Sequence, residues 1–142
     1  MVNDAYNANP ASMDAAISVA TAISTRRGSR SIAILGEMKE LGESSEVAHV
    51  GVGEAAARAG VDVLIAVGEA AAVMLEGAAH VTDWLGTAVS VRDRDSALAW
   101  LHANQLAGDV VLVKASRAAE LEWVAQNLID PKNLTDPEEQ RE

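Results

Sequence analysis

Three clusters of polar side chains have the residue types that chemistry requires. They occupy residues 4–9, 37–44 and 114–117. In the first cluster, Asp4 can accept hydrogen bonds from a ribose, and Tyr6 can offer its ring to a base or its phenol to a phosphate. This cluster is therefore a candidate ligand site. A turn rich in Asn and Asp before a proline explains the same residues without any ligand.

The third cluster has the character of an anion site. Ser116 stands at a predicted helix start, where backbone N–H groups are free to bind, and Lys114 and Arg117 flank it. Such an arrangement suits a carboxylate or a phosphate. The alternative interpretation is a serine that caps the helix between two solvated cations.

The sequence contains no complete catalytic set. It has no cysteine, no Ser-His-Asp order, no metal-binding motif and no phosphate loop with its lysine. Gly51 and Gly53 lie inside a predicted helix, so we attribute both to tight packing against a neighbour. His49 has no second histidine at metal-ligand spacing, and we interpret it as a surface residue.

Alternating strands and helices must position these clusters. The pattern predicts a Rossmann-like α/β fold, with a mostly parallel open sheet and helices on both faces. Apolar runs predict four strands, at 31–35, 61–67, 88–91 and 110–113, and we consider a fifth at the N-terminus. Helical spacing predicts helices at 12–25, 45–59, 69–76 and 95–106, the first capped by Ser12, and another after residue 117.

This fold brings the three clusters together. Each cluster follows a predicted strand, and ligands of open parallel sheets bind beyond the carboxyl ends of the strands. We therefore expect residues 4–9, 37–44 and 114–117 to share one edge of the sheet.

Composition limits the class of protein. A chain of 142 residues is most simply one domain, which we place at residues 1–129, followed by a flexible polar tail at 130–142. The net charge of -10 argues against a nucleic-acid partner. The absence of cysteine, of a signal peptide and of an apolar run of about 20 residues predicts a cytoplasmic protein without membrane insertion.

Three segments together carry a family resemblance. They are Asp-Ala-Tyr-Asn-Ala-Asn-Pro-Ala-Ser-Met at 4–13, Leu-Gly-Glu-Met-Lys-Glu-Leu-Gly at 35–42 with His-Val-Gly-Val-Gly at 49–53, and Val-Leu-Val-Lys-Ala-Ser-Arg at 111–117. In this order they resemble the C-terminal domain of the Mur ligases. The first segment is similar to the branch that uses D-alanyl-D-alanine.

The resemblance implies an amide ligase of peptidoglycan-precursor synthesis. Such an enzyme uses ATP with Mg²⁺ to activate a peptide carboxylate as an acyl phosphate, which the amine of D-alanyl-D-alanine attacks. The second substrate is a UDP-N-acetylmuramoyl-tripeptide. A central ATPase domain, which this chain lacks, would hold the Mg²⁺. The chain alone is therefore expected to be inactive.

The resemblance also implies roles for individual residues. Asp4 would contact the nucleotide ribose, and Tyr6, Asn7 and Asn9 would shape the wall of the ATP site. Lys114, Ser116 and Arg117 would bind the incoming dipeptide, with Ser116 closest to its carboxylate. The chain departs from the family at Glu37 and Ala115, where the family usually has Asp and Gly, and at residues 118–122, where Ala-Ala-Glu-Leu-Glu replaces a more Met-rich helix start.

Two other functions are kept open. The chain could belong to a Mur-type amide ligase that accepts a different amine, or it could be a non-catalytic binding module on the same scaffold. The amine that the full-length enzyme accepts distinguishes the other Mur-type ligase from the leading interpretation. The effect of an Asp4 substitution on ATP dependence distinguishes the binding module from it.

Overall fold

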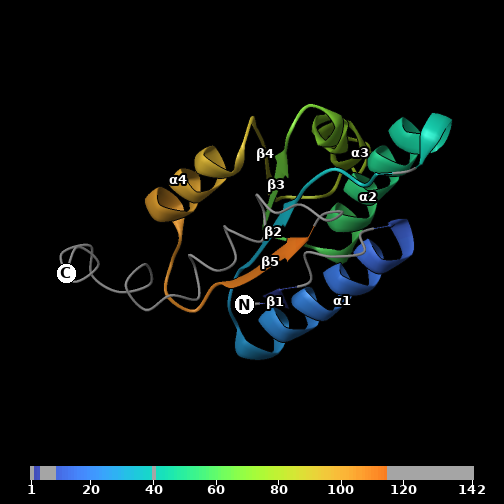
Figure 1. Cartoon of the computed structure of the whole chain (residues 1–142). Helices are drawn as coiled ribbons and strands as arrows, with labels where there is room; N and C mark the ends of the chain where they lie inside the picture. The colour runs from blue at the N-terminus through green and yellow to red at the C-terminus, as the bar shows by residue number, and fades with distance from the viewer. Residues whose placement is uncertain (1, 4–8, 40, 115–142) are drawn as a thin grey trace.

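A single parallel sheet forms the centre of the molecule (Figure 1). The computed structural model describes residues 2–3, 9–39 and 41–114. Five strands lie in the order β1-β5-β2-β3-β4, and each runs parallel to its neighbours. The parallel α/β fold and the fifth strand are thus confirmed. The strands are β1 (Val2–Asn3), β2 (Ser31–Leu35), β3 (Val63–Val67), β4 (Thr87–Val91) and β5 (Val110–Lys114).

Helices cover both faces of the sheet. The predicted helix at 69–76 is partly a 3₁₀ turn, at Ala70–Val73, and another 3₁₀ turn lies at Gly42–Ser44. The predicted helix after residue 117 and the tail at 130–142 lie outside the described residues. The α-helices are α1 (Pro10–Arg27), α2 (Ser45–Ala59), α3 (Met74–Ala79) and α4 (Arg94–Asn104); α1, α2 and α3 lie on one side of the sheet and α4 on the other.

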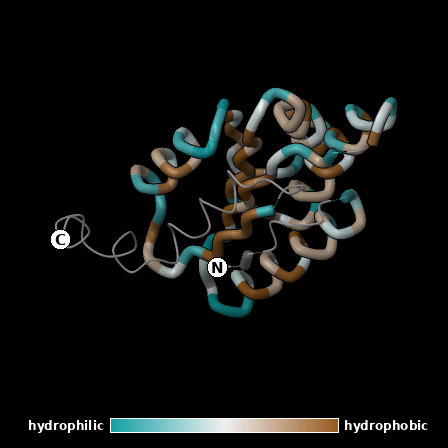
Figure 2. The backbone as a smooth tube through the Cα atoms, viewed as in Figure 1, coloured by the Kyte–Doolittle hydropathy of each residue, from teal (hydrophilic) through white to brown (hydrophobic). Residues whose placement is uncertain are grey.

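The core has two layers because side chains alternate across each strand. Along β2, Ala33 and Leu35 pack with the α1–α3 layer, while Ile32 and Ile34 pack with the α4 layer. All four are at most 1% exposed. Continuous apolar strands of this kind are expected where both faces are covered, and Figure 2 shows them as the hydrophobic centre of the molecule.

The first helix begins earlier than the sequence pattern predicts. Asn9, rather than Ser12, is the N-cap, and Pro10 occupies the first helical position. The Asn9 side-chain oxygen accepts the Ser12 N–H at 2.9 Å, and the Ser12 hydroxyl accepts the Asn9 N–H at 3.0 Å. The expectation of a Ser12 cap was wrong because Ser12 is the third residue of a reciprocal capping box, whose partner precedes the proline.

Helices α2 and α3 touch backbone to backbone. A Cβ at Gly53 would stand 1.9 Å from the Met74 carbonyl oxygen, and one at Gly77 would stand 1.9 Å from the Val50 carbonyl oxygen. Tight packing therefore explains Gly53, as predicted. It does not explain Gly51, which is exposed and has nothing within 4 Å of the place that a Cβ would take.

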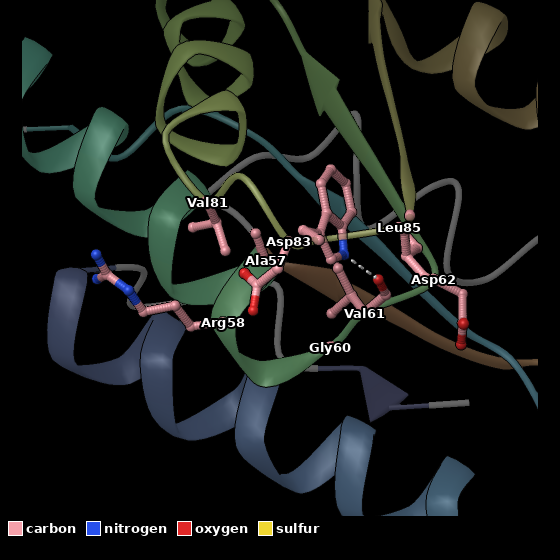
Figure 3. A pocket seen from close by; sticks show the side chains of 10 residues that line it. Ala57, Arg58, Gly60, Val61, Asp62, Val81, Asp83 and Leu85 are labelled. Carbon is pink, nitrogen blue, oxygen red and sulfur yellow. Dashed lines mark hydrogen bonds between the residues drawn. The ribbon is translucent and has the colours of Figure 1, made fainter.

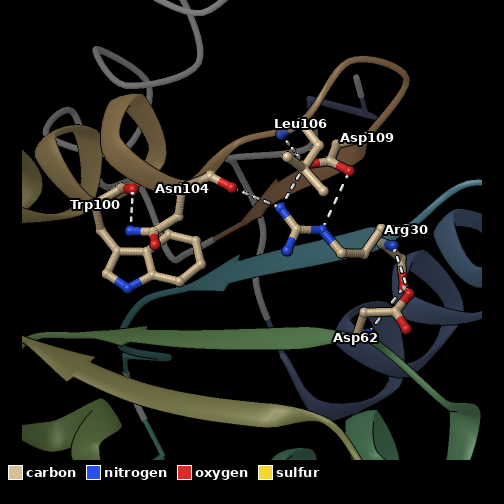
Figure 4. Close-up of polar contacts among 7 residues, drawn as sticks. Arg30, Asp62, Trp100, Asn104, Leu106 and Asp109 are labelled. Carbon is tan, nitrogen blue, oxygen red and sulfur yellow. Dashed lines mark hydrogen bonds and ion pairs between the residues drawn. The ribbon is translucent and has the colours of Figure 1, made fainter.

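A charged clamp joins β2, β5 and α4 at the amino edge of the sheet (Figure 4). Arg30 donates from Nε and Nη2 to the two carboxylate oxygens of Asp109, at 3.2 and 2.8 Å, and from Nη2 to the Asn104 carbonyl at 2.8 Å. Asp109, whose side chain is 2% exposed, also accepts the Leu106 N–H at 2.8 Å. The hydrogen bond with Asp109 raises the pKa of Arg30.

Candidate functional site

The three strands that precede the polar clusters end side by side. β5 lies between β1 and β2, with Asn3 paired with Val113 and Leu35 paired with Lys114. The Gly36 N–H donates to the Lys114 carbonyl at 2.9 Å, which ties the start of one cluster to the end of another. The predicted convergence on one edge is therefore confirmed for these strand ends. We call this carboxyl end of β1, β5 and β2 the ligand edge.

Lys114 is buried rather than solvated. Its side chain is among the largest fully buried ones, at 1% exposure. Because side chains alternate along β5, Lys114 shares the face of Leu112, which packs with the α1–α3 layer. The interpretation of Lys114 as a solvated cation was therefore wrong. Its role in binding the dipeptide stays a prediction.

Asn9 stands where the chain enters α1 at the ligand edge. Its side-chain oxygen is engaged in the helix cap, so it fixes the direction in which α1 leaves the preceding cluster. Its predicted role at a nucleotide stays a prediction. The other predicted site residues lie outside the described part of the chain: Asp4, Tyr6, Asn7, Ser116 and Arg117.

The segment 36–39, directly after β2, is the part of the second cluster best seen in the structure. Met38 is 1% exposed and belongs to the α1–α3 core layer, whereas Glu37 and Lys39 on either side of it are exposed. The side chain of Met38 thus anchors an otherwise irregular segment. The two charged neighbours consequently face solvent at the ligand edge.

His49 is a buried part of this region, which the sequence analysis missed. Its side chain is 0% exposed on α2. Nε2 accepts the Met38 N–H at 2.9 Å, and Nδ1 lies 2.6 Å from the Ser45 carbonyl oxygen. The surface assignment was wrong because His49 lies on the face of Val52 and Ala56, at spacings of three and seven residues. That spacing was visible in the sequence.

A separate pocket of about 470 Å³ lies at the opposite, amino edge (Figure 3). Its wall includes Val61 and Asp62, which precede β3, and Trp84 and Leu85, which precede β4. The Trp84 indole N–H donates to the Val61 carbonyl at 2.8 Å. None of the described residues of the three polar clusters lines this pocket, and its wall comes from the amino ends of β3 and β4, at the edge opposite the ligand edge.

The described residues hold neither a metal site nor a membrane span. In residues 2–3, 9–39 and 41–114, no group of three or more His, Cys, Asp or Glu side chains lies together as metal ligands would. No helix within these ranges is long and apolar enough to cross a membrane.

Curated relatives share this chain's sequence over most of its length. The UDP-N-acetylmuramoyl-tripeptide--D-alanyl-D-alanine ligase of Mycobacterium tuberculosis is 42% identical over 146 residues, which covers 91% of this chain and 28% of the relative. The ligase of the same description from Escherichia coli is 36% identical, over 90% of this chain and 26% of the relative. The chain thus spans little more than a quarter of the length of these relatives.

Solved structures and a family match agree with these relatives. MurF from Acinetobacter baumannii superposes with a TM-score of 0.69 at 30% identity, over 89% of this chain and 27% of that one. MurF ligase from Thermotoga maritima in complex with ADP gives a TM-score of 0.66 at 28% identity, over 87% and 26%. The family described as "Mur ligase, glutamate ligase domain" matches residues 1–117. This chain therefore belongs to the Mur ligase family.

Proposed function

We propose that this chain is the C-terminal domain of an ATP-dependent ligase that adds D-alanyl-D-alanine to a UDP-N-acetylmuramoyl-tripeptide. The observation that carries the proposal is the 42% identity with a relative of that description over 91% of the chain. The parallel strands that end together at the ligand edge supply a place for two ligands side by side. The domain is proposed to end near residue 129, with 130–142 as a polar tail.

The strand order suggests how the two ligands are arranged. Asp4, Tyr6, Asn7 and Asn9 follow β1 and are proposed to meet the nucleotide. Residues 114, 116 and 117 follow β5, which is the neighbouring strand, and are proposed to meet the dipeptide. The two sites would therefore lie next to one another, as a transfer between nucleotide-activated peptide and incoming amine requires.

The proposed reaction proceeds in two steps. The terminal carboxylate of the tripeptide attacks the γ-phosphate of ATP, which forms an acyl phosphate and releases ADP. The amine of D-alanyl-D-alanine then attacks the acyl carbon, loses a proton and expels phosphate as the amide forms. This domain would orient the dipeptide amine and cover the nucleotide.

The remaining parts of the reaction belong elsewhere in the proposed enzyme. The sequence has no phosphate loop, so the phosphates and Mg²⁺ are proposed to bind a central ATPase domain that partners this one. Mg²⁺ supplies charge neutralisation for the transferred phosphoryl group. We place the enzyme in the cytoplasm, where ATP is available.

Substitution of Asp4 tests the nucleotide role in the full-length ligase. Asp4→Ala is expected to raise the KM for ATP about tenfold, because a hydrogen bond to a charged group is lost. Asp83→Ala is the matched control, since Asp83 is exposed at the opposite edge. An ATP dependence unchanged by Asp4→Ala would favour a binding module without a nucleotide role.

The identity of the amine is tested separately. Full-length enzyme supplied with ATP and the UDP-linked tripeptide should form an amide with D-alanyl-D-alanine in preference to single amino acids. Product formation can be followed by mass spectrometry. Preference for another amino component would assign the chain to a different Mur-type amide ligase.

A further inference from the structure

The segment 36–39 is held at the ligand edge by a contact that the proposed reaction does not otherwise use. Residues 36–39 belong to no helix or strand, so their backbone groups lack the partners that regular structure provides. A buried backbone N–H without a partner is costly, and nearly all such groups in proteins are paired. Here the partner of the Met38 N–H is the Nε2 atom of His49, at 2.9 Å.

The geometry defines the proton positions on His49. Nε2 accepts a backbone N–H and therefore carries no proton, while Nδ1 lies 2.6 Å from the Ser45 carbonyl oxygen, which can only accept. The imidazole is consequently neutral, with its proton on Nδ1. The Ser45 hydroxyl lies 3.4 Å from the same nitrogen. The ring links the segment 36–39 to the first turn of α2.

The strand order indicates which ligand this segment serves. Along the ligand edge, β1 precedes the proposed nucleotide cluster, β5 precedes the proposed dipeptide cluster, and β2 lies on the far side of β5 from β1. The Gly36 N–H bonds to the Lys114 carbonyl at the end of β5. Segment 36–39 therefore borders the dipeptide side of the edge and is separated from the nucleotide side.

We propose that His49 is a positioning residue for the dipeptide site: by accepting the Met38 N–H, it fixes segment 36–39 beside Lys114 so that Glu37 and Lys39 face the incoming dipeptide. Met38 cannot move without losing both its buried side-chain packing and this bond. The directions of its two neighbours are thereby set. The identity of the ligand rests on the proposed function, whereas the hydrogen bond between His49 and Met38 does not.

Two substitutions separate positioning from general stability. A Gln side chain places its amide near the position of histidine Nε2, so His49→Gln can still accept the Met38 N–H. An Asn side chain places its amide near the position of Nδ1, so His49→Asn can keep the Ser45 contact but not the Met38 contact. The two variants are thus matched in chemistry and differ in the contact at issue.

Steady-state kinetics of the full-length ligase tests the effect on the dipeptide. His49→Asn is expected to raise the KM for D-alanyl-D-alanine about tenfold, with the KM for ATP unchanged. His49→Gln is expected to stay within about twofold of the wild type in both. Equal dipeptide KM values for the two variants, or a rise confined to ATP, would overturn the proposal.

Two measurements on the 142-residue chain test the contact without any ligase activity. Nitrogen NMR of the wild type should show His49 protonated at Nδ1 and unprotonated at Nε2, and the other tautomer would refute the inference. Amide exchange at Met38 should be slow in the wild type and in His49→Gln, and about tenfold faster in His49→Asn. If these hold while the full-length wild type does not use D-alanyl-D-alanine, the proposed function is wrong and the positioning contact stands.

Discussion

Replacing Gly53 by alanine should destabilise the protein although alanine is the better helix former. The alanine gains about 1 kcal/mol in helix propensity. Its methyl group, however, would stand 1.9 Å from the Met74 carbonyl oxygen and 2.7 Å from the carbonyl carbon. This neighbour is backbone, which cannot turn aside, so α3 must move away from α2. Overpacking of this kind costs about 1 to 3 kcal/mol, so after the gain in helix propensity we expect a net loss of about 1 to 2 kcal/mol.

Gly51→Ala is the matched control because it lies two residues away on the same helix. Gly51 is exposed and has nothing within 4 Å of the added methyl. This variant should gain about 0.5 to 1 kcal/mol. Urea unfolding followed by circular dichroism gives both values as shifts of the midpoint at constant slope. A Gly53→Ala protein as stable as Gly51→Ala would refute the inferred backbone contact between α2 and α3.

Three further outcomes are expected. Asp109→Ala should lower the free energy of unfolding by about 2 to 3 kcal/mol, since it removes the carboxylate partner of Arg30 and the acceptor of the Leu106 N–H. Arg58→Ala, which removes an exposed ion pair, should change it by less than about 0.5 kcal/mol; equal effects would contradict the clamp. The pKa of Asp93 lies below its ordinary value of 3.8, mainly because the carboxylate accepts a hydrogen bond from the Ser96 N–H and secondly because it bonds to the Ser96 hydroxyl. The wild type should therefore lose stability relative to Asp93→Asn as pH falls below that value. A difference between the urea midpoints of the two proteins that stays constant over this pH range would contradict the prediction. Calorimetry should find ATP binding to the 142-residue chain no tighter than about 1 mM, because few contacts remain without a phosphate loop; micromolar affinity would contradict this.

The arrangement of strands followed from sequence because its signals are local. Runs such as Ser31–Leu35 and Val110–Lys114 are apolar almost throughout, which indicates burial on both faces. Parallel pairing then places their carboxyl ends, and the polar residues after them, at one edge. The identity of the proposed ligands came from the family resemblance, because a pattern of apolar residues predicts burial and not ligand chemistry.

The errors concern polar side chains whose capping partner or buried face was not recognised from the pattern. The Asn9 cap was missed because its partner lies across Pro10, and the burial of Lys114 depends on alternation counted from Leu112. His49 was assigned to the surface by its polarity, yet its Met38 partner comes from a different element. Polarity alone predicts exposure, but a satisfied hydrogen bond permits burial.

The position of β5 has a consequence for the order in which the molecule acquires its structure. Val2 pairs with Leu112, and β5 also supplies the partner for β2, so the strand near the end of the described chain fills the gap between the two earliest ones. Pairings this distant in sequence are closed late, since the intervening chain must first be ordered. During synthesis, β1 therefore cannot pair with β5, and the ligand edge cannot form, until β5 has left the ribosome. The three strand ends of the ligand edge come together only when β5 pairs with β1 and β2.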